Sequence, residues 1–213
     1  KQQIDVMYRE IVKEMGVHEL QQHKVIRQVD KYETAYSHSS RLIENKKIWE
    51  LWLGDSVENV KKLEDKSVGQ VITSVPFPAM YAYTSSNRDI GNYENPEELC
   101  EHLKYVFVNL LPKMKPGRLI EIHLSQGVAF LNRHGYIGLL DFRGALVKMM
   151  TDIGYIFHGE LMIEKDPQTE QARNHTVGLL QGTLGRDAIH MRPSVADYIT
   201  QFRAPGINDE PIV

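Results

Sequence analysis

Cysteine is almost absent from this sequence, and its scarcity excludes two kinds of structure. The only thiol among the 213 residues is that of Cys100. One thiol cannot form an internal disulfide framework or a cysteine zinc cluster. Cys100 lies in a segment, 96–103, whose pattern predicts a helix, and we interpret it as a buried structural thiol rather than a reactive one. The nine histidines show no spacing with carboxylates that is typical of a metal site, and we predict no metal.

Long apolar runs are absent as well. No stretch approaches the roughly 18 consecutive apolar residues of a membrane-spanning helix, and the first residues lack the pattern of a secretory signal. Hydrophobic residues make up 42% of the chain and charged residues 25%, which is typical of soluble domains. We therefore expect a cytoplasmic protein that does not contact a membrane.

The chain also lacks an excess of positive charge. Its formal net charge is −3, whereas nucleic-acid-binding domains are usually basic. A DNA-binding role is not excluded, because only one face of the protein needs to be positive. The most basic stretch contains Arg173, His175, Arg186, His190 and Arg192. For this stretch, contact with a DNA backbone and a solvated surface are equal alternatives.

Residues 1 to about 47 are polar, and their pattern predicts helices. Apolar residues fall at helical spacing over 4–15, Gly16 ends this run, and a second run covers 18–36. Neither run has a broad apolar face. We predict a helical arm or linker that packs on the rest of the chain or joins it to something upstream, with DNA contact or oligomerisation as the alternative.

From residue 48 onward, predicted strands and helices alternate. The strands are expected at 48–53, 67–73, 118–124, 155–164 and 196–203. The helices are expected from 56 to about 63, at 96–114 and at 142–153. This alternation is typical of an α/β fold with a mostly parallel sheet. Ligands bind such sheets at the carboxyl ends of the strands.

Two polar patterns follow predicted strands. The first is Leu53-Gly54-Asp55-Ser56, where Asp55 could accept hydrogen bonds from a ribose or an adenine amine. Capping of the next helix by Asp55 or Ser56 is an equal alternative. The second is Thr73-Ser74-Val75-Pro76-Phe77, which ends the next predicted strand.

Together these patterns resemble the N4-cytosine and N6-adenine DNA methyltransferases, in the permuted order where the catalytic loop precedes the cofactor glycine loop. The likeness covers roughly 48–213. It continues through segments 78–84, 88–92, 116–118, 138–144, 164–167 and 197–198, which look like a phage and prophage branch with a place in restriction-modification. The resemblance implies part of a Rossmann-like class I methyltransferase sheet, S-adenosyl-L-methionine as methyl donor and DNA as substrate.

The resemblance also implies roles for the second pattern. Ser74 and the carbonyl of Val75 or Pro76 would hold the two hydrogens of the target amine, whose lone pair is otherwise delocalised into the base. Phe77 would stack on a base flipped out of the duplex, and proline would hold the carbonyls in place. Asp55, Ser74 and Phe77 would also contact the cofactor. The residues expected to touch DNA are Tyr81, Tyr83, Arg143, Lys165, Arg173, Arg186 and Arg192.

Several of these residues have a second interpretation. Asp141 is as well explained by a helix N-cap as by any catalytic role, and Arg143 could pair with a carboxylate instead of a phosphate. Lys165-Asp166-Pro167 could line a DNA cleft or form a turn.

The sequence departs from the family pattern in two places. Val75 stands where the family usually has its first proline, which removes one fixed φ angle but keeps the carbonyl. No Asp-Pro-Phe-x-Gly-x-Gly loop for the cofactor is present, and the glycine-rich stretch 178–185 follows no predicted strand. We therefore expect a piece of a larger polypeptide, with a C-terminal cofactor half and an upstream helicase-like region.

Three alternatives follow. A catalytically degenerate module could bind DNA or a partner without transferring a methyl group. An unrelated small-molecule α/β enzyme has less support, because no nucleophile–base pair is recognisable in the sequence. Within the methyltransferase interpretation, serine at position 74 slightly favours cytosine N4 over adenine N6, and both bases remain candidates.

Overall fold

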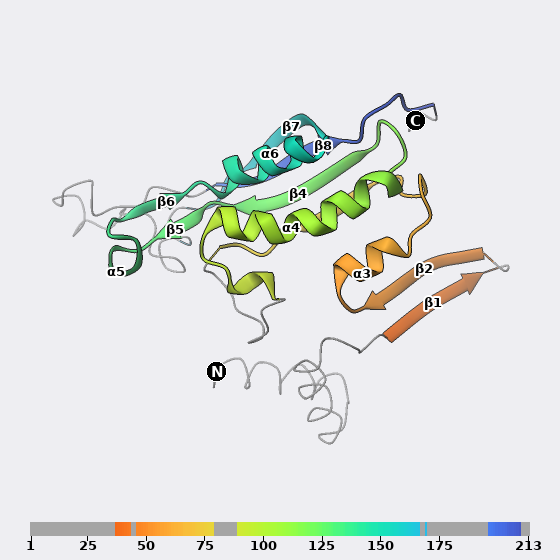
Figure 1. Ribbon diagram of the computed structural model, residues 1–213, viewed down its shortest axis with the longest axis horizontal. Coiled ribbons are helices and arrows are strands. Elements are labelled where there is room, and N and C mark those ends of the chain that lie inside the picture. Colours follow the sequence, from red (N-terminus) through yellow and green to blue (C-terminus); the bar gives the residue numbers. More distant parts are fainter. Residues whose placement is uncertain (1–36, 44–45, 79–88, 167–168, 170–195, 210–213) are drawn as a thin grey trace, which may run out of the picture. The chain divides into compact units, whose positions relative to one another are not determined.

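The computed structural model describes residues 37–43, 46–78, 89–166, 169 and 196–209 (Figure 1). The chain divides into two units, 1–59 and 60–213. The division falls later than the boundary at 47 that the sequence predicts. No helix in the described part of the chain is both long and apolar enough to span a membrane.

The first unit contains a two-stranded antiparallel hairpin. Strand β1 (Ser37–Ile43) pairs with β2 (Lys46–Leu53), with an irregularity between Arg41 and Leu42. The strand expected at 48–53 is confirmed. The helical expectation is wrong for 37–43, because the serines there favour helix interiors poorly and the backbone bonds to β2 instead. The helices expected at 1–16 and 18–36 lie outside the described residues.

A short helix, α3 (Ser56–Lys61), follows β2. Its first turn is capped by Asp55, whose Oδ1 accepts a hydrogen bond from the Val57 N–H at 2.8 Å. This is the capping alternative for Asp55 that the sequence left open.

The second unit is built on a four-stranded sheet. Its strands lie in the order β3 (Val71–Ser74), β4 (Leu119–Ser125), β8 (Asp197–Arg203), β7 (Ile156–Ile163). Strands β3 and β4 are parallel, whereas β8 is antiparallel to both of its neighbours. The predicted mostly parallel sheet is therefore mixed, because the last strand enters between two earlier ones in the opposite direction.

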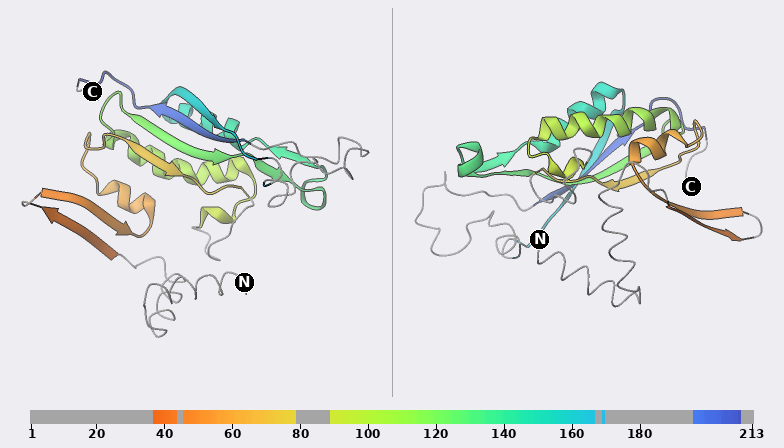
Figure 2. Two further views of the ribbon diagram at one scale, coloured as in Figure 1. Left: turned by 180° about the vertical axis from the view of Figure 1, so that it is seen from behind. Right: turned by 60° about the horizontal axis from the view of Figure 1, so that its bottom comes forward.

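Two helices cover one face of this sheet, α4 (Pro96–Leu110) and α6 (Phe142–Ile153) (Figures 1 and 2). Asn95 caps α4 by accepting from the N–H groups of Glu97 and Glu98. Gly154 ends α6 in the left-handed conformation, with φ of 114°. Both helices occur where the sequence predicts them, although α4 gives way after Leu110 to a 3₁₀ turn, η2 (Leu111–Lys113).

The core lies between these helices and the sheet. Its fully buried members come from four elements: Leu99, Phe142, Leu146, Met150, Ile120, Ile122, Leu124 and Phe202. Strand β4 alternates between these buried residues and the half-buried Glu121 and His123. Because successive side chains on a strand point to opposite faces, Glu121 and His123 face away from the helices.

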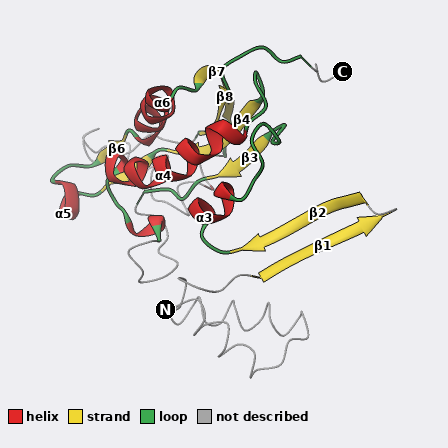
Figure 3. Ribbon diagram, turned by 45° about the vertical axis from the view of Figure 1, so that its right-hand side comes forward, coloured by secondary structure: helices red, strands yellow, loops and turns green. Residues whose placement is uncertain are grey.

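Four small elements were not predicted from the sequence. Strands β5 (Gly127–Ala129) and β6 (Gly138–Leu140) form an antiparallel pair around helix α5 (Leu131–His134), and a 3₁₀ turn, η1 (Ile90–Asn92), precedes α4 (Figure 3). Each has only three or four residues. Such lengths are too short for a periodic pattern to emerge.

Candidate functional site

Ser74 is the last residue of β3, at the carboxyl end of the strand. The loop that follows is anchored in the core, because Val75 is 6% exposed and Pro78 is fully buried. Ser74 itself is exposed. Alternation along the strand turns its side chain away from the face that the helices cover. The predicted catalytic loop therefore presents Ser74 on the face of the sheet opposite α4 and α6.

His123 lies directly beside Ser74. The parallel register pairs the two residues, and the Ser74 Oγ atom is 3.1 Å from His123 Nδ1. The other ring nitrogen of His123, Nε2, is 3.0 Å from Oδ2 of Asp197, the first residue of β8. Serine, imidazole and carboxylate thus form a hydrogen-bonded chain, which we call the Ser74–His123–Asp197 relay. This serine–histidine pair is not recognisable in the sequence, because 49 residues separate its members.

Asp197 is held as a carboxylate. Burial disfavours its ionised form, but hydrogen bonds from Lys165, Ser125 and His123 outweigh burial, so the pKa of Asp197 is lowered. The ammonium of Lys165 lies 2.6 Å from Asp197 Oδ1. An ionised carboxylate can only accept hydrogen bonds, so Nε2 of His123 carries the hydrogen. In neutral His123, Nδ1 is then an acceptor, and the Ser74 hydroxyl donates to it.

Phe77 borders the same site. Its ring meets the His123 ring edge-on, with the centroids 5.6 Å apart and the planes at 67°. The side chain is half-buried and packs against the core. Phe77 therefore lines one side of the imidazole. Its predicted stacking on a base is not tested by this contact.

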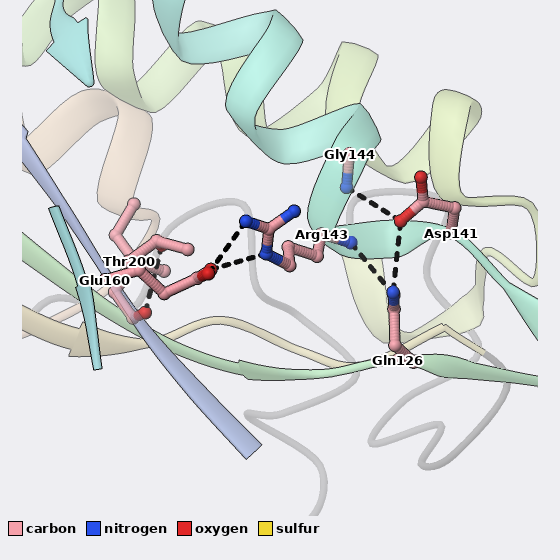
Figure 4. Close-up of polar contacts among 7 residues, drawn as sticks. Gln126, Asp141, Arg143, Gly144, Glu160 and Thr200 are labelled. Carbon is pink, nitrogen blue, oxygen red and sulfur yellow. Dashed lines mark hydrogen bonds and ion pairs between the residues drawn. The ribbon is translucent and has the colours of Figure 1, made fainter. Parts of the chain in front are cut away.

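Of the predicted DNA contacts, the structure brings Lys165 into the site, where Asp197 neutralises its charge. Arg143 lies elsewhere, at the start of α6. Its Nε and Nη2 donate to the two carboxylate oxygens of Glu160 at 2.5 and 2.7 Å (Figure 4). The carboxylate partner that the sequence offered as the alternative for Arg143 is thus the one observed. Its predicted DNA contact stays a prediction.

The cap of α6 adjoins Arg143. Asp141 Oδ1 accepts from the Gly144 N–H at 2.9 Å and from the Gln126 side chain at 3.1 Å (Figure 4). Backbone and side-chain hydrogen bonds from these two residues lower the pKa of Asp141. The N-cap interpretation of Asp141 is confirmed.

The remaining predicted residues fall in other places. Asp55 belongs to the first unit, where it caps α3. The others lie outside the described residues: Tyr81, Tyr83, Arg173, Arg186 and Arg192. Among the described residues, no group of three or more histidine, cysteine, aspartate or glutamate side chains is arranged to hold a metal ion.

Sequence reasoning missed His123, Ser125 and Asp197. The signal for His123 was its polar place in the apolar alternation of the strand at 118–124, next in the sheet to the strand that ends in Ser74. Asp197 was noticed only as part of the family likeness. Its proximity to His123 depends on the antiparallel entry of β8, which local patterns do not specify.

The relationship of this chain to known proteins lies in its fold. No family model matches the chain, and no curated protein matches it. A structure of a candidate DNA modification methylase of Thermus thermophilus, complexed with S-adenosyl-L-methionine, is 18% identical, with a TM-score of 0.52 over 75% of this chain and 55% of that chain. Another structure of the same protein is 19% identical, with a TM-score of 0.51 over 75% of this chain and 56% of that chain.

The chain spans about half the length of these solved structures. At this level of identity, the likeness concerns the fold. The second unit shares part of the Rossmann-like sheet of these solved structures, which is the fold that the resemblance in sequence implied. The Ser74 loop lies at a carboxyl end of that sheet, where α/β folds bind their ligands.

Proposed function

We propose that this chain forms the target-amine side of an S-adenosylmethionine-dependent DNA methyltransferase that acts on the exocyclic amine of cytosine or adenine. The observation that carries this proposal is the 3.1 Å contact between the Ser74 Oγ atom and His123 Nδ1, from which the direction of the Ser74 hydroxyl follows. Because Ser74 donates its hydrogen to His123, its oxygen lone pairs are free to accept from an N–H group in front of the strand end.

The chemistry of an aromatic amine explains why such an acceptor is needed. The nitrogen lone pair is delocalised into the base, and acceptors for its hydrogens draw the nitrogen toward tetrahedral geometry. Ser74 supplies one acceptor, and the backbone carbonyl of Val75 or Pro76 supplies the second. The buried Val75 and Pro78 hold this loop in place, so its dipoles are oriented before the substrate arrives.

The residues present fit the amine end of the reaction. S-adenosylmethionine supplies the electrophilic methyl group. The sequence has no Phe-x-Gly-x-Gly loop, so we assign the adenosyl end to protein outside this chain. Contact of Asp55, Ser74 and Phe77 with the cofactor remains part of the proposal.

DNA is the proposed substrate, with the target base flipped out of the helix. Tyr81 and Tyr83 would stack on bases, and the side chains of Arg173, Arg186 and Arg192 would contact phosphates. Lys165 borders the site and would face the target nucleotide. A phage or prophage origin and a role in DNA modification belong to this proposal too.

The proposal can be tested on DNA extracted from cells that express the complete gene containing this chain. We expect nucleoside mass spectrometry to find N4-methylcytosine or N6-methyladenine, and the identity of the product settles the base. Ser74→Ala should abolish the signal, whereas Ser67→Ala, which alters an exposed serine outside the loop, should leave it unchanged. Absence of both modified bases with the wild-type gene, or their persistence with Ser74→Ala, would contradict the proposal.

One observation favours a second candidate function. Serine, histidine and aspartate in hydrogen-bonded series are also the parts of a hydrolase with a serine nucleophile. A fluorophosphonate probe distinguishes the two functions, because it forms a covalent adduct with an activated serine. A methyltransferase loop predicts no adduct at Ser74, whereas labelling of Ser74 that disappears in His123→Asn would favour hydrolysis.

A further inference from the structure

We propose that His123 is the positioning and proton-accepting residue behind Ser74, and that Asp197 fixes the ring tautomer that this role requires. This inference rests on the proposed function. Its geometric basis is the relay itself, because one imidazole bonds to the loop serine through Nδ1 and to a buried carboxylate through Nε2.

The tautomer follows from the surroundings of the ring. In the part of the chain that the structure describes, three groups contact His123: Ser74 of β3, Asp197 of β8 and the Phe77 ring. Lys165, in the segment after β7, and Ser125 bond to Asp197. These contacts keep Asp197 ionised, and the carboxylate requires a hydrogen on Nε2. Nδ1 is thereby left as an acceptor for the Ser74 hydroxyl.

The same arrangement provides a path for a proton. Transfer forms a bond between the target nitrogen and the methyl carbon and breaks the carbon–sulfur bond, whose electron pair stays on sulfur. The nitrogen is then positively charged and must lose a proton. That proton passes to Ser74 Oγ as the hydroxyl proton of Ser74 passes to Nδ1 of His123. Serine is unchanged at the end, His123 is an imidazolium, and Asp197 balances its charge.

His123 is able to release this proton afterwards. Its side chain is 35% exposed, whereas that of Asp197 is 9% exposed. The imidazolium therefore has access to solvent while its carboxylate partner stays buried and oriented. A histidine with a purely structural role would need neither the exposed edge nor the free acceptor toward Ser74.

The first experiment observes the ring without any turnover. In the wild-type chain labelled with ¹⁵N-histidine, NMR at a pH where His123 is neutral should show the hydrogen on Nε2 and a hydrogen-bonded Nδ1. Ser74→Ala should change the Nδ1 signal and leave the hydrogen on Nε2. Asp197→Asn can donate to Nε2 and should shift the hydrogen to Nδ1. A wild-type ring with its hydrogen on Nδ1 would overturn the inference.

The second experiment measures single-turnover methyl transfer by the complete enzyme. His123→Asn keeps an acceptor near Ser74 but cannot take up a proton, and we expect a loss of about 100-fold or more, the usual range of general-base contributions. His123→Gln provides a second variant if the first fails to fold. The matched control is His158→Asn, because His158 is an exposed histidine of β7.

The pH profile separates proton uptake from structural support. The pH–rate profile of a folded His123→Asn enzyme should differ in shape from that of the wild type, because only the wild type has a proton acceptor behind Ser74. Rates within about twofold of wild type for both His123 variants, with Ser74→Ala inactive, would refute the inference and leave the proposed function intact. Absence of methylated base in wild-type DNA would refute the proposed function, whereas the NMR result stands independently of it.

Discussion

The hydroxyl oxygen of Ser74 lies 3.1 Å from Nδ1 of His123, and the parallel pairing of β3 with β4 is what brings them together. This contact gives the serine a defined direction. A hydroxyl that donates backward to an imidazole can accept from a substrate in front of it. The contact therefore links a backbone register to the chemistry proposed for the loop. The first prediction concerns Asp197, the carboxylate that bonds to the other side of His123.

Asp197→Asn should destabilise the protein at pH 7 by about 1–3 kcal/mol, because hydrogen bonds to a charged group are lost. The lowered pKa means that the carboxylate contributes stability above the unfolded-state value of about 3.9. This contribution is lost as the pH falls through the lower folded-state pKa. In urea unfolding at pH 7, 4 and 3, the free energy of unfolding of the wild type should approach that of Asp197→Asn as the pH falls.

The control for this prediction is Asp152→Asn, which alters an exposed aspartate paired with Lys148 within α6. Its effect should stay below about 0.5 kcal/mol, as for most exposed ion pairs. If the difference in free energy of unfolding between wild type and Asp197→Asn stays constant down to pH 3, the ionised form of Asp197 does not contribute the predicted stability.

Cys100 should be unreactive in the native protein. Burial, followed by the nearby carboxylates Glu97 and Glu101, raises the pKa of Cys100 to about 12, so almost no thiolate is present at pH 8. A colorimetric disulfide reagent should leave the native thiol unmodified and titrate one equivalent in guanidinium chloride. Val108→Cys places a second thiol at an exposed position of α4 and should react in the native state. Fast native modification of Cys100 would contradict its burial.

The helices that frame the core could be predicted because their signals are local. Asn95 and Pro96 mark the start of α4, and Gly154 marks the end of α6, where the structure has a cap, a first-turn proline and a left-handed glycine. The Ser74 loop was predictable for the same reason, since its motif is contiguous and follows a strand.

The direction and neighbours of β8 could not be predicted in this way. A strand pattern at 196–203 gives alternation but neither partner nor orientation. Pairing of Asp197 with Ser125 across the antiparallel register depends on where the chain returns after β7. The contact between His123 and Asp197 could not be predicted from the sequence, because the two residues are 74 positions apart and meet only when β8 pairs with β4.

Arg143 and Glu160 should couple more strongly than an exposed ion pair. Their two hydrogen bonds are parallel and partly shielded, with side-chain exposures of 35% and 23%. A double-mutant cycle with Arg143→Met and Glu160→Gln should give a coupling energy of about 1–2 kcal/mol in urea unfolding. The cycle cancels the separate contact of Arg143 with the Tyr198 ring, which both arginine variants lose equally.

The matched comparison is Lys148 with Asp152, an exposed pair four residues apart on α6. That pair should couple by about 0.3–0.5 kcal/mol. Equal coupling energies for the two pairs would mean that partial burial and the second hydrogen bond do not strengthen the interaction between Arg143 and Glu160.

The effect of Gly144→Ala on the free energy of unfolding should depend on whether Asp141 or alanine stands at position 141. A Cβ at Gly144 would lie 2.2 Å from Asp141 Oδ2, so the Asp141 side chain must leave its capping position. Losing the cap costs about 1 kcal/mol, which opposes the gain of roughly 0.5–1 kcal/mol from alanine in a helix. In the wild type we expect a net effect near zero or slightly destabilising. In an Asp141→Ala background the cap is already lost, so Gly144→Ala should stabilise by its full helix propensity. Thermal and urea unfolding of the four proteins measure both values, and the same gain in both backgrounds would show that the Asp141 side chain does not limit position 144.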